Sequence, residues 1–168
     1  MEAKKLAQAA PLPFQLSLRI RHPSIDPAEL SREFGIEPEH CFRAGDPRPT
    51  RIRGAGAALH AESYWLGELL PAGASREASF LEHPRVGSLR EPLGATAAQR
   101  LSWALLWTAR LFFKTNGERL RAIRAEGGNV TLLVTISTDE LRSFSLTPEI
   151  SRTLSDFDIA VEIEFAPD

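Results

Sequence analysis

Residues 14–34 read FQLSLRIRHPSIDPAELSREF, and this stretch decides the fold. Its first part alternates apolar and polar residues with a period of two, which is the pattern of a strand with one buried face. Its second part carries helix start signals, because Asp26 can cap the first turn and Pro27 fits the first helical position. Gly35 follows as a stop signal. We therefore expect a half-buried strand, with Leu16 and Leu18 in its inward row, followed directly by a helix over 27–34.

The same order of signals returns near the C-terminus. A strand is predicted over 130–136, and its two faces are apolar enough to place it centrally in a sheet. Ser145-Leu146-Thr147-Pro148 then repeats the cap-and-proline pattern of Ser24-Ile25-Asp26-Pro27, which predicts a helix over 148–155. A last strand follows, in which we expect Ile159, Val161, Ile163 and Phe165 to point inward and Ala160, Glu162 and Glu164 outward.

The segments between these two units complete the expected fold. Residues 64–66 are a short apolar run typical of a strand, residues 96–113 have a helical apolar face, and 118–125 predict a further helix. Residues 36–61 are rich in Pro and Gly and are expected to be irregular. Two strand-helix-strand halves predict an α+β, ferredoxin-like fold, with a mainly antiparallel four-stranded sheet and helices on one face. We expect a flexible tail over 1–13 and a single domain over 14–168, with an irregular insertion at about 71–95.

Composition narrows the class of protein. The chain has 168 residues, a formal net charge of −2 and one cysteine, which suits one domain without an internal disulfide. The net charge gives no electrostatic argument for nucleic-acid binding. No apolar run approaches the ~18 residues of a membrane span. These features predict a cytoplasmic protein with no membrane or nucleic-acid partner and no cofactor.

Several short motifs carry a resemblance to a known family. They are Gly35-Ile36-Glu37-Pro38, Arg43-Ala44-Gly45-Asp46, Trp65, Ser145-Leu146-Thr147 and residues 158–163. With them, most of the chain after the tail resembles the bacterial domain of unknown function 4279. The chain departs from that pattern in the insertion over 71–92 and in the brief strand at Trp65. The resemblance implies the fold and a bacterial origin, and it supplies no catalytic residues.

The candidate ligand site is the arginine-rich loop 43–56. Guanidinium groups and glycine N–H groups can together hold a phosphate or a carboxylate. The alternative is a turn whose arginines pair with the acidic last strand, which makes the loop a structural clamp. The candidate ligand-binding residues are Arg43, Asp46, Arg48, Arg51, Arg53 and Trp65.

Other chemically active residues form no recognisable set. Zinc sites usually contain closely spaced ligand pairs, and no such spacing connects His22, His40, His60, His83 and Cys41. A nucleophile–base pair of Cys41 and His60 requires the fold to bring them together. Glu162 and Glu164 are neighbours on one strand face, where carboxylates usually protect a sheet edge. Trp103 and Trp107 share a helix face and favour packing. The sequence predicts no metal site and no catalytic residue.

Two hypotheses of different class remain open, and the sequence favours a non-catalytic role over an enzyme. The first is a module that binds another protein, for which a toxin-neutralising immunity protein is one concrete version by analogy; a homodimer is also open. Its support is an acidic C-terminal segment without a convergent catalytic set. The second is an enzyme or sensor that binds a small anion or nucleotide at the arginine-rich loop.

Overall fold

The structure is a computed structural model that describes residues 13–49, 58–70, 95–137, 141 and 143–166. Nearly all of the expected tail and of the expected insertion lies outside the described residues. Within them the element order is β1 (Phe14–His22), α1 (Pro27–Phe34), β2 (Pro38–Phe42), β3 (Ser63–Leu70), α2 (Ala97–Thr108), a π-helical turn η1 (Ala109–Phe113), α3 (Gly117–Ala125), β4 (Asn129–Ile136), α4 (Pro148–Asp156) and β5 (Ala160–Phe165).

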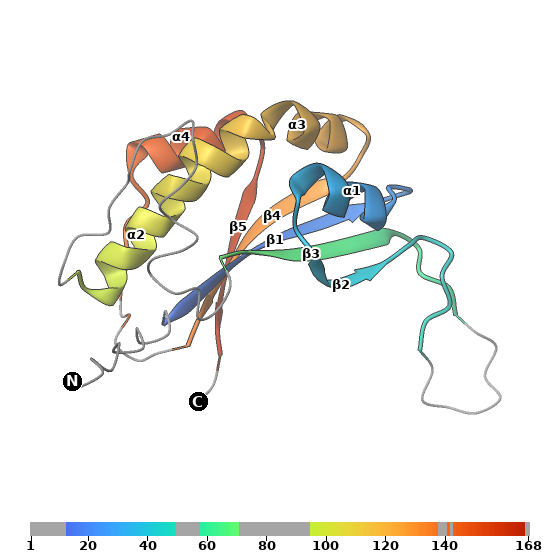
Figure 1. The fold of residues 1–168 in the computed structure, drawn as a ribbon, viewed down its shortest axis with the longest axis horizontal. Coiled ribbons are helices and arrows are strands. Elements are labelled where there is room, and N and C mark those ends of the chain that lie inside the picture. The colour runs from blue at the N-terminus through green and yellow to red at the C-terminus, as the bar shows by residue number, and fades with distance from the viewer. Residues whose placement is uncertain (1–12, 50–57, 71–94, 138–140, 142, 167–168) are drawn as a thin grey trace, which may run out of the picture.

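The strands form one open sheet in the order β2-β3-β1-β4-β5. Every neighbouring pair is antiparallel except β4 and β5, which run parallel. The four described α-helices lie together on one side of the sheet (Figure 1). The molecule is therefore an α+β fold with a five-stranded, mostly antiparallel sheet covered by helices on one face. We call the opposite face of the sheet the open face.

The expected ferredoxin-like topology is not confirmed. That topology consists of two split β-α-β units, in which another strand lies between the two parallel strands of each unit. The unit β1-α1-β2 is split in this way, because β3 pairs with both strands. The unit β4-α4-β5 is not split, since its strands are direct parallel neighbours. The two halves thus share local signals and differ in how their strands pair.

The expectation of four strands was also wrong, because β2 lies inside the segment expected to be irregular. Its sequence, PEHCF, begins with proline and lacks regular alternation. Proline can begin a strand or lie on an edge strand, where its missing N–H costs no sheet hydrogen bond. β2 is such an edge strand. Its pairing with β3 is what forms it, and β3 itself extends well beyond the three residues expected.

The helix boundaries follow the sequence signals closely. The Asp26 carboxylate accepts a hydrogen bond from the Ala28 N–H, and α1 ends at Gly35, whose φ of 67° is left-handed and suits glycine. Thr147 caps α4 in the same manner through the Ile150 N–H. The long helix expected over 96–113 begins at the Thr96 cap and passes into η1 after Thr108. No described helix is long and apolar enough to cross a membrane.

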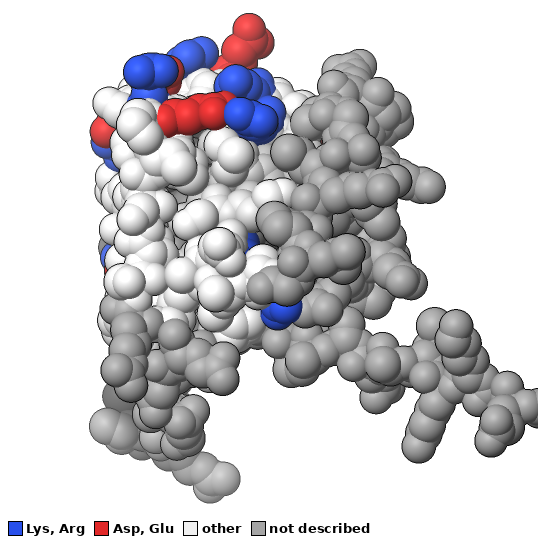
Figure 2. Space-filling model, turned by 90° about the vertical axis from the view of Figure 1, so that its left-hand side faces the viewer, with Lys and Arg blue, Asp and Glu red and all other residues white. Residues whose placement is uncertain are grey.

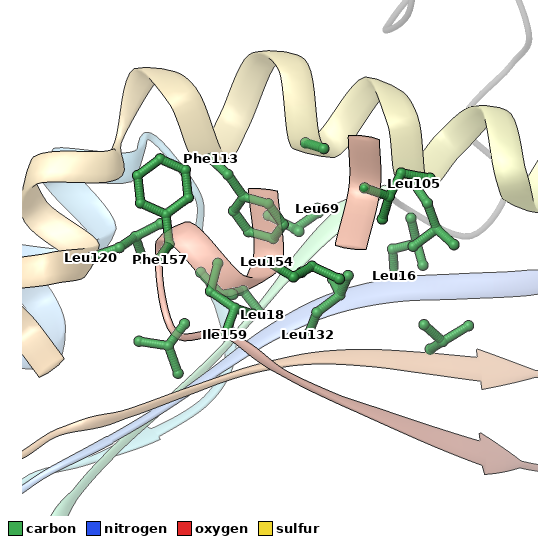
Figure 3. Close-up of a cluster of buried hydrophobic side chains, with 14 of the residues drawn as sticks. Leu16, Leu18, Leu69, Leu105, Phe113, Leu120, Leu132, Leu154, Phe157 and Ile159 are labelled. Carbon is green, nitrogen blue, oxygen red and sulfur yellow. The ribbon is translucent and has the colours of Figure 1, made fainter. Parts of the chain in front are cut away.

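The core lies between the helices and the sheet. The inward row of β1 is confirmed, since Leu16, Leu18 and Ile20 have no exposed surface. Figure 3 shows Leu16, Leu18 and Leu132 on the sheet facing apolar side chains from the helices above. In β3, Gly67 leaves room for the Trp65 ring, because a Cβ there would approach that ring to 2.3 Å. A side chain at residue 67 would displace the tryptophan from the core.

We expect Leu18→Asp to lower the free energy of unfolding by more than about 4 kcal/mol, because it buries a charge with no partner. Urea denaturation measures this difference. Thr131→Asp on the open face of β4, beside Arg19, is the matched control and should cost at most about 1 kcal/mol. Equal losses for the two variants would contradict the assignment of faces.

Candidate functional site

A row of planar side chains crosses three strands of the open face. In the strand register Phe42 of β2 lies opposite Tyr64 of β3, and Tyr64 lies opposite Arg21 of β1. The Phe42 and Tyr64 ring centroids are 5.1 Å apart, and the Arg21 guanidinium carbon lies 6.0 Å from the Tyr64 centroid. His60 stacks on Phe42 with a centroid distance of 3.7 Å. Such cross-strand contacts stabilise the sheet edge at β2.

An open cavity of about 500 Å³ lies along this row. The Tyr64 phenol is protonated at neutral pH and can donate a hydrogen bond, and burial raises its pKa further above the ordinary value of 10.0. The Arg21 guanidinium has a distant carboxylate neighbour, with 3.7 Å between its Nη1 and Glu62 Oε1. The chemistry suits a small oxyanion, although Glu62 repels one. The lining residues are Arg21, Phe42, Arg48, Pro49, His60, Glu62 and Tyr64.

The arginine-rich loop is divided by the structure. The Arg43 Nη2 donates to both carboxylate oxygens of Asp26, at 2.8 Å each. Asp46 accepts a hydrogen bond from the Arg43 N–H at 2.8 Å and so closes the turn. Arg48 is exposed and lines the cavity, while Arg51 and Arg53 lie outside the described residues. Of the described arginines of the loop, Arg48 is the one that lines the cavity.

The clamp between this loop and the last strand is not formed by the described arginines. Glu162 instead pairs with Arg19 of β1, across the open face. Arg43 takes its carboxylate from the cap of α1, as described above. The charge of Arg43 is thus compensated by Asp26, a residue that the sequence pattern had assigned to a helix cap.

Trp65 is part of the core and not of a ligand site. Its side chain is fully buried, and its indole N–H donates to Ser31 Oγ at 3.0 Å. The ring also packs edge-on against Phe34 of α1, with centroids 5.6 Å apart. It lies on the face of β3 opposite to Tyr64, because neighbouring residues of a strand alternate between faces. A ligand on the open face would meet Tyr64 in its place.

The histidines are used separately. His22 is buried, and its Nδ1 accepts hydrogen bonds from the N–H groups of Ser24 and Ile25, which shapes the turn before α1. His60 is in the ring stack, and His83 lies outside the described residues. Cys41 pairs in register with Trp65, on the helix side, so it does not meet His60 as a nucleophile would meet a base. No three potential metal ligands cluster among the residues the structure describes.

The far end of β5 departs most from the sequence expectation. Ile159 is buried and Val161 is partly buried, as expected. Ile163 and Phe165 were expected to point inward, yet they are 43% and 71% exposed. β5 is an edge strand, and its second half extends past the side chains that cover its first half. Two of the four exposed large apolar side chains found in the described part of the chain therefore lie here, two residues apart.

Sequence reasoning missed both surface features for the same reason. An alternating strand indicates which side chains share a face, but it does not indicate whether that face is covered. The row of Phe42, Tyr64 and Arg21 side chains depends on the register of β2 with β3, which no local pattern encodes. The exposure of Ile163 and Phe165 depends on the position of β5 at the sheet edge. No local signal identifies either feature.

The comparisons with known proteins add no relative. No family model matches the chain, and neither a curated protein nor a solved structure shows significant similarity to it.

We expect Asp26→Asn to show what the charge at the α1 cap contributes. The Ala28 N–H and, to a smaller degree, the Arg43 guanidinium lower the pKa of Asp26 below its ordinary value of 3.8. The ionised form therefore stabilises the fold above about pH 3.8, and this stabilisation is lost as the pH falls through the lowered pKa. Asparagine keeps the cap without the charge. The gap in melting temperature between parent and variant should close between pH 5 and 2, and a constant gap would contradict this.

Proposed function

We propose that the protein is a non-catalytic module that binds another protein, and that the far end of β5 is part of its binding surface. The exposure of Phe165, 71% on an edge strand, is the observation that carries this proposal. Aromatic side chains are enriched at protein interfaces, where they bury a large area at a small entropic cost. Ile163 adds a second apolar side chain on the same strand face.

The distribution of charge on one side of the molecule agrees with the proposal. Figure 2 shows the side of the molecule on which α2 and α4 lie, at the left of Figure 1. Charged side chains of both signs gather at the top of this view, and the described surface below them is largely uncharged. A folded protein rarely leaves apolar side chains together on an edge strand, because such an edge recruits other chains. Occupation of that edge by a specific partner explains why the chain keeps them.

The proposal also includes the family and the role that the sequence suggested. The resemblance to the domain of unknown function 4279 rests on short motifs, and the toxin-neutralising immunity role rests on analogy. Both remain proposals, as do a cytoplasmic location and the absence of a nucleic-acid or membrane partner. A binding role needs none of the convergent nucleophile, base or metal-ligand groups that an enzyme would need, and it agrees with the scattered positions of the histidines and Cys41.

The proposal is tested by cross-linking in the producing cell. A photoreactive benzoyl-phenylalanine at residue 165 should capture a defined protein, whereas the same amino acid at Arg32, which is exposed on α1, should not. The captured protein is then purified, and its affinity for the parent and for Phe165→Ser is compared. We expect a loss of at least about tenfold, because a buried aromatic anchor contributes ~2 kcal/mol or more.

Either of two results would contradict the proposal. One is the same set of cross-linked products from residues 165 and 32. The other is unchanged affinity of Phe165→Ser for the captured protein, with the variant shown to be folded by its melting temperature.

The cavity on the open face supports a second candidate function, the binding of a small anion or nucleotide. Arg48, Arg21 and the Tyr64 hydroxyl together offer donors to an oxyanion. Of the ligand-binding residues expected from the sequence, this candidate site retains Arg48, and Tyr64 takes the place expected for Trp65.

Melting temperatures separate the second candidate from the first. Binding of an anion to the folded state raises the melting temperature in proportion to the logarithm of its concentration above Kd. We expect no rise with millimolar phosphate or ATP in the parent or in Arg48→Ala. A rise in the parent that Arg48→Ala abolishes would favour the anion-binding function.

A further inference from the structure

We infer that the outer edge of β5 accepts an extended segment of the partner protein as an added strand, and that this segment alternates Lys or Arg with apolar residues. The inference rests on the proposed function and names the chemistry of the partner. It concerns the β5 edge, by which we mean the side of residues 161–165 that faces away from β4.

The backbone of the β5 edge provides the first part of the inference. On its inner side β5 pairs with β4 over the whole range from Ala160 to Phe165. Among the described residues no strand pairs with its outer side. A strand with one free side presents a row of N–H and C=O groups that can pair with another chain. β5 has six residues, which is an ordinary length for strand pairing.

The side chains of the β5 edge provide the second part. Ile163 and Phe165 are exposed on the helix side of the sheet, so an added strand must offer apolar residues there. Glu162 and Glu164 alternate with them on the open face. Glu162 is already paired with Arg19, whereas Glu164 has no ion pair among the described residues. A basic side chain opposite Glu164 is the complement that this pattern requires.

The same charges disfavour a second copy of this chain as the added strand. In an antiparallel pair centred on Ile163, Glu162 of one copy opposes Glu164 of the other. A pair centred on either glutamate opposes that residue to its own copy. The registers that overlap the two strands most fully, those centred on Glu162, Ile163 or Glu164, therefore bring like charges together, which destabilises strand pairing. The charges thus select a basic strand from another protein.

Designed peptides test the inference directly. The probe is a labelled, blocked peptide of about eight residues that alternates arginine with valine or isoleucine, since strands of this length form readily in sheets. Its matched control has the same composition with all arginines at one end. Binding is measured by fluorescence anisotropy at about 150 mM salt, where unpaired surface charges more than ~8 Å apart are screened.

We expect the alternating peptide to bind at least about tenfold more tightly than the control peptide that has all its arginines at one end. Binding should slow amide hydrogen exchange in residues 161–165 and not in β2, the opposite edge of the sheet. Glu164→Lys should weaken the alternating arginine peptide by about tenfold and should gain affinity for a peptide that alternates glutamate with the same apolar residues. This exchange of charge excludes a loss caused by misfolding.

Other results would overturn the inference. Equal binding of the two arginine peptides would show attraction to net charge alone, and unchanged exchange over 161–165 would place the peptide elsewhere. No binding of either peptide would mean that Glu162 and Glu164 protect the edge against all added strands. Dimerisation of the parent with protection of 161–165 would make a second copy the occupant. If one of these results were found together with a positive cross-link at residue 165, the protein-binding proposal would stand and the addition of a basic strand from the partner would be rejected.

Discussion

The burial of one row of side chains along β1 is the constraint on which the rest of the structure depends. β1 lies at the centre of the sheet, between β3 and β4, and its apolar row has essentially no exposed surface. All described helices must therefore pack on that side, and none of them covers the other side (Figure 1). The Phe42–Tyr64–Arg21 row and the cavity are consequences, because they occupy a face that no described helix covers.

The parts of the fold that sequence predicts are those with local signals. The period of β1, the Asp26 cap and the Thr147-Pro148 start each encode their element within a few residues, and each was confirmed. β2 has no such signal, and it forms through its pairing with β3, which begins some twenty residues later in the chain. The order of the strands is equally non-local. The two similar sequence units predicted the same strand pairing in both halves. In the structure β3 lies between β1 and β2, whereas β4 and β5 pair directly.

The candidate site was less predictable than the fold, and the arginine-rich loop shows the physical reason. A cluster of like charges indicates that anions lie nearby, but it does not indicate which ones. Arg43 takes the Asp26 carboxylate, a helix cap some 17 residues earlier in the chain. Trp65 shows the opposite error, since it was expected to contact a ligand and the strand places it in the core. Pairing partners decide both cases, and they are long-range.

The two ends of β5 show how this fold can both hold a strand and leave it available. At its start, Arg124 of α3 bonds Asp158 and the Gly128 carbonyl, which fixes the turn before β5 to the start of β4. Phe157 packs against Gly117, where a Cβ would approach the ring to 2.3 Å. Beyond the ion pair of Glu162 with Arg19, pairing with β4 is the contact among described residues that holds the far end of the strand. An added strand there would bury Ile163 and Phe165 without disturbing the anchored end, so binding at the β5 edge requires no rearrangement of the core.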